Sequence, residues 1–165
     1  MTEVLEALGV GTYDAWWALW GAPTKVAAVA APDDDGTSGI GAQGSATVRQ
    51  SFTLSPSAIP PGSTINSVSI RGRFSRDNPG ATFAPFLRLA GTNQDGPSTD
   101  PGTPWVTLSF TIARPGGGSW SLADLSTLEI GAYADSGAYD WISTLEAVVD
   151  YTPPTATTGA MLLLF

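Results

Sequence analysis

The sequence contains neither cysteine nor histidine. Without cysteine, the chain forms no disulfide and has no thiol nucleophile or thiolate metal ligand. Without histidine, it lacks the most common general base and the most common ligand of transition metals. Ser–His–Asp catalysis is therefore excluded, and no Gly-x-Ser-x-Gly elbow is present either.

Positive charge and long apolar runs are also scarce. The chain has 7 Lys and Arg against 15 Asp and Glu, a net charge of −8 at pH 7. A surface of this sign repels the phosphates of nucleic acids and the headgroups of anionic membranes. The apolar stretch 159–165 is far shorter than the roughly 20 residues that span a bilayer. The first ten residues carry glutamates and no basic residue, unlike a secretory signal. We therefore expect neither a nucleic-acid nor a membrane partner.

Glycine and proline are abundant instead, with 19 Gly and 13 Pro in 165 residues. Many of them lie at the edges of short runs in which apolar and polar residues alternate, a pattern typical of all-β domains. The longest run is 139–151, which Pro153 and Pro154 end because proline cannot donate to a strand ladder. Its alternation places Trp141 on the same apolar face as Leu145 and Val149. A half-buried strand long enough to cross a sandwich is predicted here.

Shorter strands are predicted at 47–54, 68–75, 83–89, 105–112 and 128–134. We expect the last to form a hairpin with 139–151, and residues 119–125 to plug one end of the sandwich with Trp120 and Leu122. The predicted fold is all-β: a single jelly-roll-like antiparallel β-sandwich at 41–152. An aromatic N-terminal arm at 1–40 precedes it, and an apolar C-terminal tail at 153–165 follows.

Within the arm, residues 2–8 predict one or two helical turns, and 25–32 predict a strand or an extended connector. Half of the six tryptophans fall between them, at Trp16, Trp17 and Trp20. This cluster fits a segment that covers a sheet face or edge of its own domain. It also fits a contact surface for another subunit, because tryptophan is enriched in interface cores. A stacking platform for sugars or bases is the third interpretation.

The sequence predicts no cofactor, with calcium as the one alternative. Asp33, Asp34 and Asp35 precede a glycine, and Ca²⁺ takes several oxygen ligands in a flexible loop. The spacing departs from an EF-hand, because Gly44 stands where the closing glutamate is needed. Adjacent acids on a turn also fit a solvated loop. Both interpretations stay open at this stage.

Two further segments are candidates for partner contact. The polar loop 91–104 carries Asp95 and Asp100, and long loops in compact domains are often functional. The chain ends in an apolar cluster, which favours association when exposed. This tail either adds an edge strand to its own domain or inserts into a neighbouring subunit. The residues of the cluster are Met161, Leu162, Leu163, Leu164 and Phe165.

The best catalytic candidate is a carboxylate pair, Glu129 and Glu146, because two acids serve glycoside hydrolysis. Both glutamates are predicted on solvated sheet faces. Without burial, nothing raises the pKa of a carboxylic acid. Salt bridges with the arginine stripe Arg71, Arg73 and Arg76 are expected instead. We therefore expect no enzymatic activity.

Several loose motifs together carry a resemblance over roughly residues 13–151. They are Asp34-Asp35-Gly36-Thr37-Ser38, Gln50-x-Phe52-x-Leu54, Ile59-Pro60-Pro61-Gly62 before Val68-x-Ile70-x-Gly72-Arg73, Ser119-Trp120-Ser121-x-x-Asp124-Leu125, and Val148-x-Asp150-Tyr151. With this series, the chain resembles the small jelly-roll-like β-sandwich structural proteins of tailed-bacteriophage virions.

The resemblance implies a non-enzymatic virion component on the capsid surface or tail. Its preferred interpretation is a capsid decoration or cement protein, a homo-oligomer that stabilises the particle through contacts with itself and with other virion subunits. The alternative is a tail- or fibre-associated module that binds carbohydrate or another receptor. In that module, exposed tryptophans would stack on sugar and Asp33–Asp35 would hold Ca²⁺.

Overall fold

The computed structural model describes residues 1–30, 37–43, 48–77, 79–135 and 139–155. Strands dominate, so the predicted all-β class is confirmed, and no helix of these ranges is long and apolar enough to cross a membrane. The elements are β1 (Thr2–Asp14), β2 (Ala18–Trp20), α1 (Lys25–Ala30), β3 (Gly39–Gln43), β4 (Arg49–Leu54), β5 (Thr64–Arg76), β6 (Phe83–Leu89), β7 (Thr92–Asp95), β8 (Val106–Thr111), α2 (Leu122–Leu125), β9 (Glu129–Ala134) and β10 (Tyr139–Thr152).

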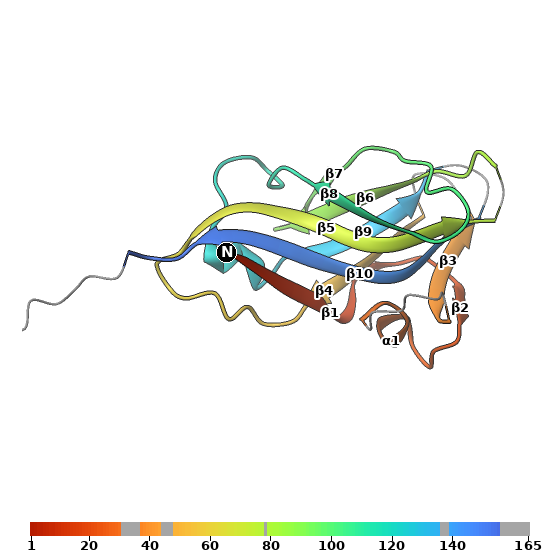
Figure 1. The fold of residues 1–165 in the computed structure, drawn as a ribbon, viewed down its shortest axis with the longest axis horizontal. Helices are drawn as coiled ribbons and strands as arrows, with labels where there is room; N and C mark the ends of the chain where they lie inside the picture. The colour runs from red at the N-terminus through yellow and green to blue at the C-terminus, as the bar shows by residue number, and fades with distance from the viewer. Residues whose placement is uncertain (31–36, 44–47, 78, 136–138, 156–165) are drawn as a thin grey trace, which may run out of the picture.

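The strands form two antiparallel sheets that share β1 (Figure 1). In the first sheet, β10 pairs with β5 on one side and with β3 and β1 on the other, while β2 and β8 form the edges. In the second sheet, the order is β1-β4-β9-β6-β7. Residues 2–6 of β1 pair with β10. Residues 7–14 pair with β4, and this second pairing contains two register shifts. One strand therefore connects the two layers.

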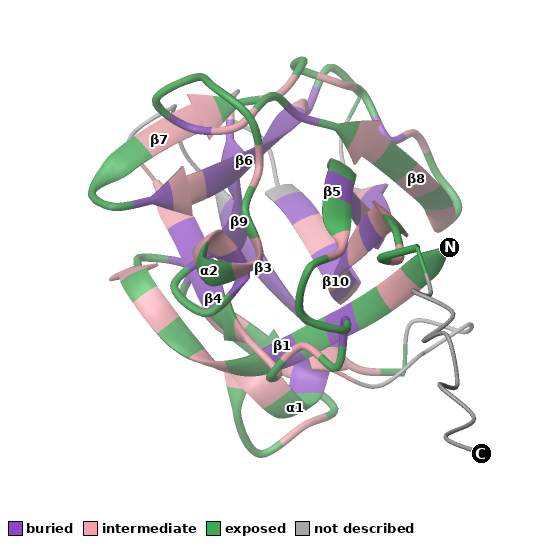
Figure 2. Cartoon of the chain, turned by 90° about the vertical axis from the view of Figure 1, so that its left-hand side faces the viewer, coloured by how far each residue is buried: buried purple, intermediate pink, exposed green. Residues whose placement is uncertain are grey.

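The core lies between the two sheets, where the inward-facing side chains are buried, and β6 and β9 are buried on both faces (Figure 2). Phe74 of β5 stacks on Phe83 of β6 with ring centroids 4.1 Å apart, so this contact joins the layers. The α2 region closes one end, with Trp120 and Leu122 packed against the core as predicted. Ser121 caps α2: its hydroxyl accepts a hydrogen bond from the backbone N–H of Asp124, and the Asp124 carboxylate accepts one from the backbone N–H of Ser121.

The N-terminal predictions need correction. Residues 2–8 are part of strand β1 rather than a helix, because Leu5 and Ala7 are buried while Val4 and Leu8 are exposed, the period of a strand. β1, β2 and β3 all belong to the sheets, so the sandwich begins near residue 2 and residues 1–40 are not a separate arm.

Residues 25–30 are helical, not a strand or an extended connector. Thr24 caps this helix, since its hydroxyl accepts a hydrogen bond from the backbone N–H of Ala27. The four-residue spacing also closes a bond from Ala28 N–H to the Thr24 carbonyl. α1 buries Ala28 and Val29. An alanine-rich segment after a threonine cap favours a helix. In the sequence, the apolar character of the same residues favours a strand.

The predicted hairpin of 128–134 with 139–151 is wrong. β9 pairs with β4 and β6, whereas β10 pairs with β1, β3 and β5. The chain therefore crosses from the second sheet to the first between these strands. Each strand buries an apolar face, and the two faces meet across the core instead of sharing one sheet.

A β-bulge changes which face Trp141 occupies. Ile142 pairs with Phe74 and Thr144 with Arg73, so Ser143 is an extra residue on β10. Leu145 points into the core as predicted, but Trp141 lies on the outer face of the first sheet because the bulge shifts the alternation between them. The bulge thus places an aromatic side chain on the surface.

The buried carboxylate of Asp140 has no partner among the residues that the structure describes. Asp140 is 1% exposed, and neither of its side-chain oxygens has a hydrogen-bond partner within these ranges. Burial raises the pKa of Asp140 to about 7, with a further contribution from the negative charges of Asp100 and Asp135. The charge of Arg76 acts in the opposite direction. Between about pH 4 and pH 7, the folded chain therefore keeps the Asp140 side chain more protonated than the unfolded chain does.

We predict that Asp140→Asn raises stability at alkaline pH. The folded-state pKa of Asp140 lies above the ordinary Asp value of 3.8, so between these two values the folded state binds more protons than the unfolded state. The stability that this group contributes to the wild type therefore falls as pH rises from about 4 to about 7. The variant lacks this loss. Denaturant midpoints measure it at about pH 5 and pH 8 for wild type, Asp140→Asn and the exposed control Asp77→Asn, whose carboxylate pairs with no described residue. An Asp140→Asn midpoint equal to wild type at the higher pH contradicts the prediction.

Candidate ligand-binding site

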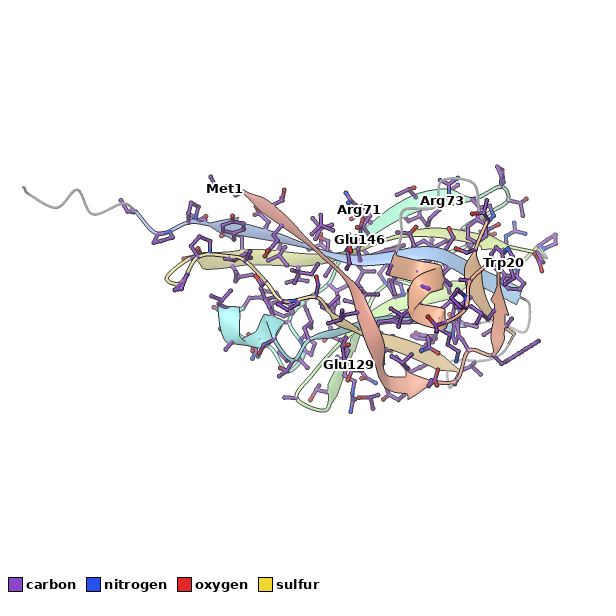
Figure 3. The ribbon with its side chains drawn as sticks, turned by 90° about the horizontal axis from the view of Figure 1, so that it is seen from below. Met1, Trp20, Arg71, Arg73, Glu129 and Glu146 are labelled. Carbon is purple, nitrogen blue, oxygen red and sulfur yellow. The ribbon has the colours of Figure 1, made fainter. Side chains whose placement is uncertain are left out.

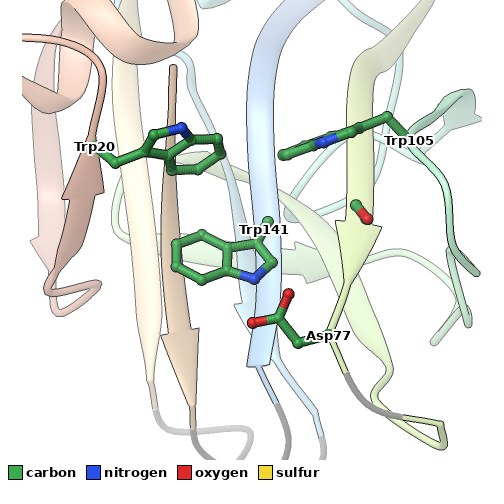
Figure 4. A pocket seen from close by; sticks show the side chains of 5 residues that line it. Trp20, Asp77, Trp105 and Trp141 are labelled. Atoms are coloured by element: carbon green, nitrogen blue, oxygen red, sulfur yellow. The ribbon is translucent and has the colours of Figure 1, made fainter. Parts of the chain in front are cut away.

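Three tryptophans meet on the outer face of the first sheet (Figure 4). Trp20 ends β2, Trp105 directly precedes β8 and Trp141 lies near the start of β10. The rings of Trp20 and Trp141 are perpendicular with centroids 5.1 Å apart, and those of Trp20 and Trp105 are tilted by 33° at 5.8 Å. Trp20 therefore contacts both other rings.

A hollow of about 350 Å³ lies among these rings and is completed by Ser75 and Asp77. Ser75 pairs with Trp141 in the ladder and is nearly buried, so it lies at the base. Asp77 is exposed just beyond the end of β5, and its carboxylate lies beside the Trp141 ring (Figure 4). We call these five residues the tryptophan hollow.

Two glycines of β3 allow the rings to lie against the backbone. A Cβ on Gly41 would stand 2.3 Å from the Trp141 ring, and a Cβ on Gly39 would stand 2.3 Å from the Trp20 ring. Contacts this short do not occur between real side chains, so any other residue would lift the rings. The glycines thus determine how the aromatic faces are held.

This arrangement suits binding rather than chemistry. Indole faces present flat apolar surfaces with specific packing geometry, and Ser75 and Asp77 add a few polar groups that orient a ligand. The hollow contains no pair of acids and no activated nucleophile among its five residues. It can hold the face of a ring or a small cation.

The outer face of the second sheet is different, because its polar groups already have partners. The Arg49 guanidinium lies 4.8 Å from the Phe86 centroid and 4.3 Å from the Tyr133 centroid. It also donates two hydrogen bonds to Asp95, and this hydrogen bonding raises the pKa of Arg49 despite partial burial. Burial raises the pKa of Tyr133. We interpret this cluster as a set of contacts that stabilises the sheet.

The predicted carboxylate pair does not form. Glu129 of β9 and Glu146 of β10 lie on opposite outer faces of the sandwich (Figure 3). Burial alone would raise the pKa of Glu129, but hydrogen bonds from Ser51 and Thr12 outweigh it and the pKa is lowered. The expected ion pair of Arg71 with Glu146 is present. Glu129 is therefore not poised to donate a proton at neutral pH.

The three tryptophans predicted to contact a partner have different environments. Trp16 is fully buried and donates its indole N–H to the Val48 carbonyl, so its assignment as a partner contact is corrected to a core residue. Trp17 is 62% exposed. Trp20 belongs to the tryptophan hollow. The cluster thus divides between core and surface.

The two acids of the polar loop pair within the chain: Asp95 with Arg49, and Asp100 with Arg76. Their role in partner contact stays a prediction. Two other sets lie outside the described residues, and their predicted roles are also untested. These sets are the calcium candidates Asp33, Asp34 and Asp35, and the tail residues Met161, Leu162, Leu163, Leu164 and Phe165.

Sequence reasoning missed that Trp105 and Trp141 form a site with Trp20. Strand alternation places Trp105 with Thr107 and Ser109 on the solvated face of its strand, which was a usable signal. For Trp141, the signal was hidden by the bulge. The sequence also gave no means of knowing that three strands distant along the chain are neighbours.

No family model matches the chain, and no curated protein matches it. Six chains of solved structures do. One contains the CBM22-1 and GH10 modules of an endo-1,4-β-D-xylanase from Clostridium thermocellum, complexed with xylohexaose, with a TM-score of 0.51 and 11% identity over 88% of this chain. Another is a CBM22-1 xylan-binding domain from Paenibacillus barcinonensis, with a TM-score of 0.48 and 13% identity over 89% of this chain.

The chain spans 28% of the length of the first of these structures and 92% of the second. At such identities the likeness shows the fold, a β-sandwich shared with modules that bind carbohydrate. None of these matches bears on the virion resemblance, so capsid or tail location, homo-oligomerisation and contacts with virion subunits stay predictions.

We predict that Gly41→Ala displaces the Trp141 ring without unfolding the sandwich. The three atoms nearest to the new Cβ all belong to that ring, and overpacking of this kind costs about 1–3 kcal/mol. The near-ultraviolet circular dichroism of the tryptophans should change, whereas Gly9→Ala, which meets only the Thr53 hydroxyl, should leave it unchanged.

A double-mutant cycle tests the cause. In a Trp141→Ala background, the stability cost of Gly41→Ala should largely disappear, because the clashing ring is gone. An equal cost in both backgrounds would show that Gly41 matters for the backbone and not for the ring.

Proposed function

We propose that the protein is a non-catalytic carbohydrate-binding module whose binding site is the tryptophan hollow. The observation that carries this proposal is the convergence of Trp20, Trp105 and Trp141 around an open hollow on a sheet face. Sugar rings have apolar C–H faces and polar edges. The flat indoles match the faces, and Ser75 and Asp77 match the edges.

The size and exposure of the hollow support this use. About 350 Å³ is at the lower end of the range for small-molecule sites, enough for one or two sugar rings. Because it opens on a sheet face, a longer chain can continue past it on either side. The fold is shared with part of a two-module xylanase chain that was solved with xylohexaose, which is consistent with the proposal but does not identify the sugar or its site.

Binding rather than hydrolysis follows from the carboxylates. In the described part of the chain, the two glutamates considered for catalysis lie on opposite faces, and glycosidases need two acids about 5–10 Å apart across one bond. A location at a phage tail or fibre, and calcium at Asp33–Asp35, are further proposals that fit this function and rest on the sequence alone.

The test is titration with a panel of soluble oligosaccharides, followed by calorimetry and by tryptophan fluorescence. Trp105→Ala and Trp141→Ala should each weaken binding about tenfold or more, because a central aromatic anchor contributes roughly 2 kcal/mol. Trp17→Ala is the matched control, since it removes an exposed tryptophan outside the hollow.

Equal losses for Trp17→Ala and Trp141→Ala would place the binding site elsewhere. Unchanged affinity in both hollow variants would also contradict the proposal. Neither Trp105 nor Trp141 is fully buried, so both variants should fold. The denaturant midpoint of each variant checks this.

A further inference from the structure

We infer that the tryptophan hollow selects glycans that carry protonated amino groups, such as polymers of glucosamine, over neutral and acidic ones. This inference rests on the proposed carbohydrate-binding function and names the substrate class of the same site.

The first argument is the charge state of the hollow. Asp77 is the one ionisable residue among the five that line it, and no basic side chain is among them. Asp77 is exposed and makes no hydrogen bond or ion pair with any residue in the described ranges. Its negative charge is therefore available to a ligand.

The second argument concerns the arginines of β5. Arg76, next to Asp77 in sequence, pairs with Asp100, and Arg71, on the outer face of the strand, pairs with Glu146. Arg73 lies between them and makes no ion pair with a described residue, but it does not line the hollow and does not pair with Asp77. An ammonium group entering the hollow thus meets a carboxylate that pairs with no described arginine.

The third argument is the aromatic walls. A cation over an indole face is attracted by the ring quadrupole, most strongly for tryptophan. Rings tilted at 33° and 85° to Trp20 offer faces in different directions, so a cation beside one ring lies near a second. The net charge of −8 adds a long-range attraction for cationic chains and repels uronate-containing ones.

The experiment compares two hexasaccharides that differ at their amino groups, which are free in the fully deacetylated glucosamine oligomer and acetylated, and therefore uncharged, in its counterpart. Affinities are measured by calorimetry at about pH 5.5, where sugar amines are protonated. Wild type should bind the deacetylated oligomer about fivefold more tightly or better, as expected for one exposed ion pair and a cation–π contact. In about 0.5 M salt this preference should shrink.

Three variants separate the causes. Asp77→Asn should remove most of the preference, because it weakens binding of the deacetylated oligomer more than binding of the N-acetylated one. Asp150→Asn makes the same charge change on β10, nine residues beyond Trp141 and about 30 Å further along the strand, and should keep the preference. Trp141→Ala should weaken both oligomers.

Equal affinity for the two oligomers, or a preference that survives Asp77→Asn, overturns this inference. The proposed carbohydrate-binding function still stands in that case if Trp141→Ala abolishes binding. A wild-type protein that binds neither these oligomers nor any neutral sugar of the panel overturns both.

Discussion

The pairing of β10 with three strands is the constraint on which the rest of the structure depends. β5 follows β10 along nearly its whole length, while β3 and then β1 occupy its other edge. β1 follows β3 along this edge of β10, and the same strand β1 then continues into the second sheet. β10 thus determines where the tryptophan hollow lies and where β1 connects the two sheets. The buried row of Leu145, Ala147 and Val149 stabilises this pairing from the core side.

The hollow depends on two departures from regular strand geometry. The bulge at Ser143 turns Trp141 outward while the following residues stay in the core, and the glycines of β3 leave room for the rings to lie flat. Neither feature contributes to burial of apolar area. Bulges occur often next to binding sites, where they redirect a side chain. Their combination here, with Asp77 at the end of β5, distinguishes this face from the other sheet, where Arg49 is fully engaged by Asp95 and two aromatic rings.

Local patterns in the sequence predicted the strands and the closing of one end by Trp120, because alternation and turn residues act over a few positions. Pairing partners were beyond reach. The turn before β10 indicated a reversal, but whether β9 and β10 share a sheet depends on how their apolar faces meet. α1 and β1 were each misread, since apolar spacing over six or seven residues fits both periods. Of the site, the sequence indicated Trp20; Trp105 and Trp141 join it only through long-range pairing and the bulge.

The packing of the three rings has a consequence for the thermodynamics of binding. An isolated exposed tryptophan on a loop must be immobilised when it meets a ligand, and each such ordering costs about 0.5–1.5 kcal/mol. Here Trp20 already packs on Trp105 and Trp141, and two rings rest on glycine backbone. Most of the ordering entropy has therefore been lost on folding, before any ligand arrives. A pre-formed surface of this kind favours ligands that are themselves stiff, because two rigid partners lose little freedom on meeting.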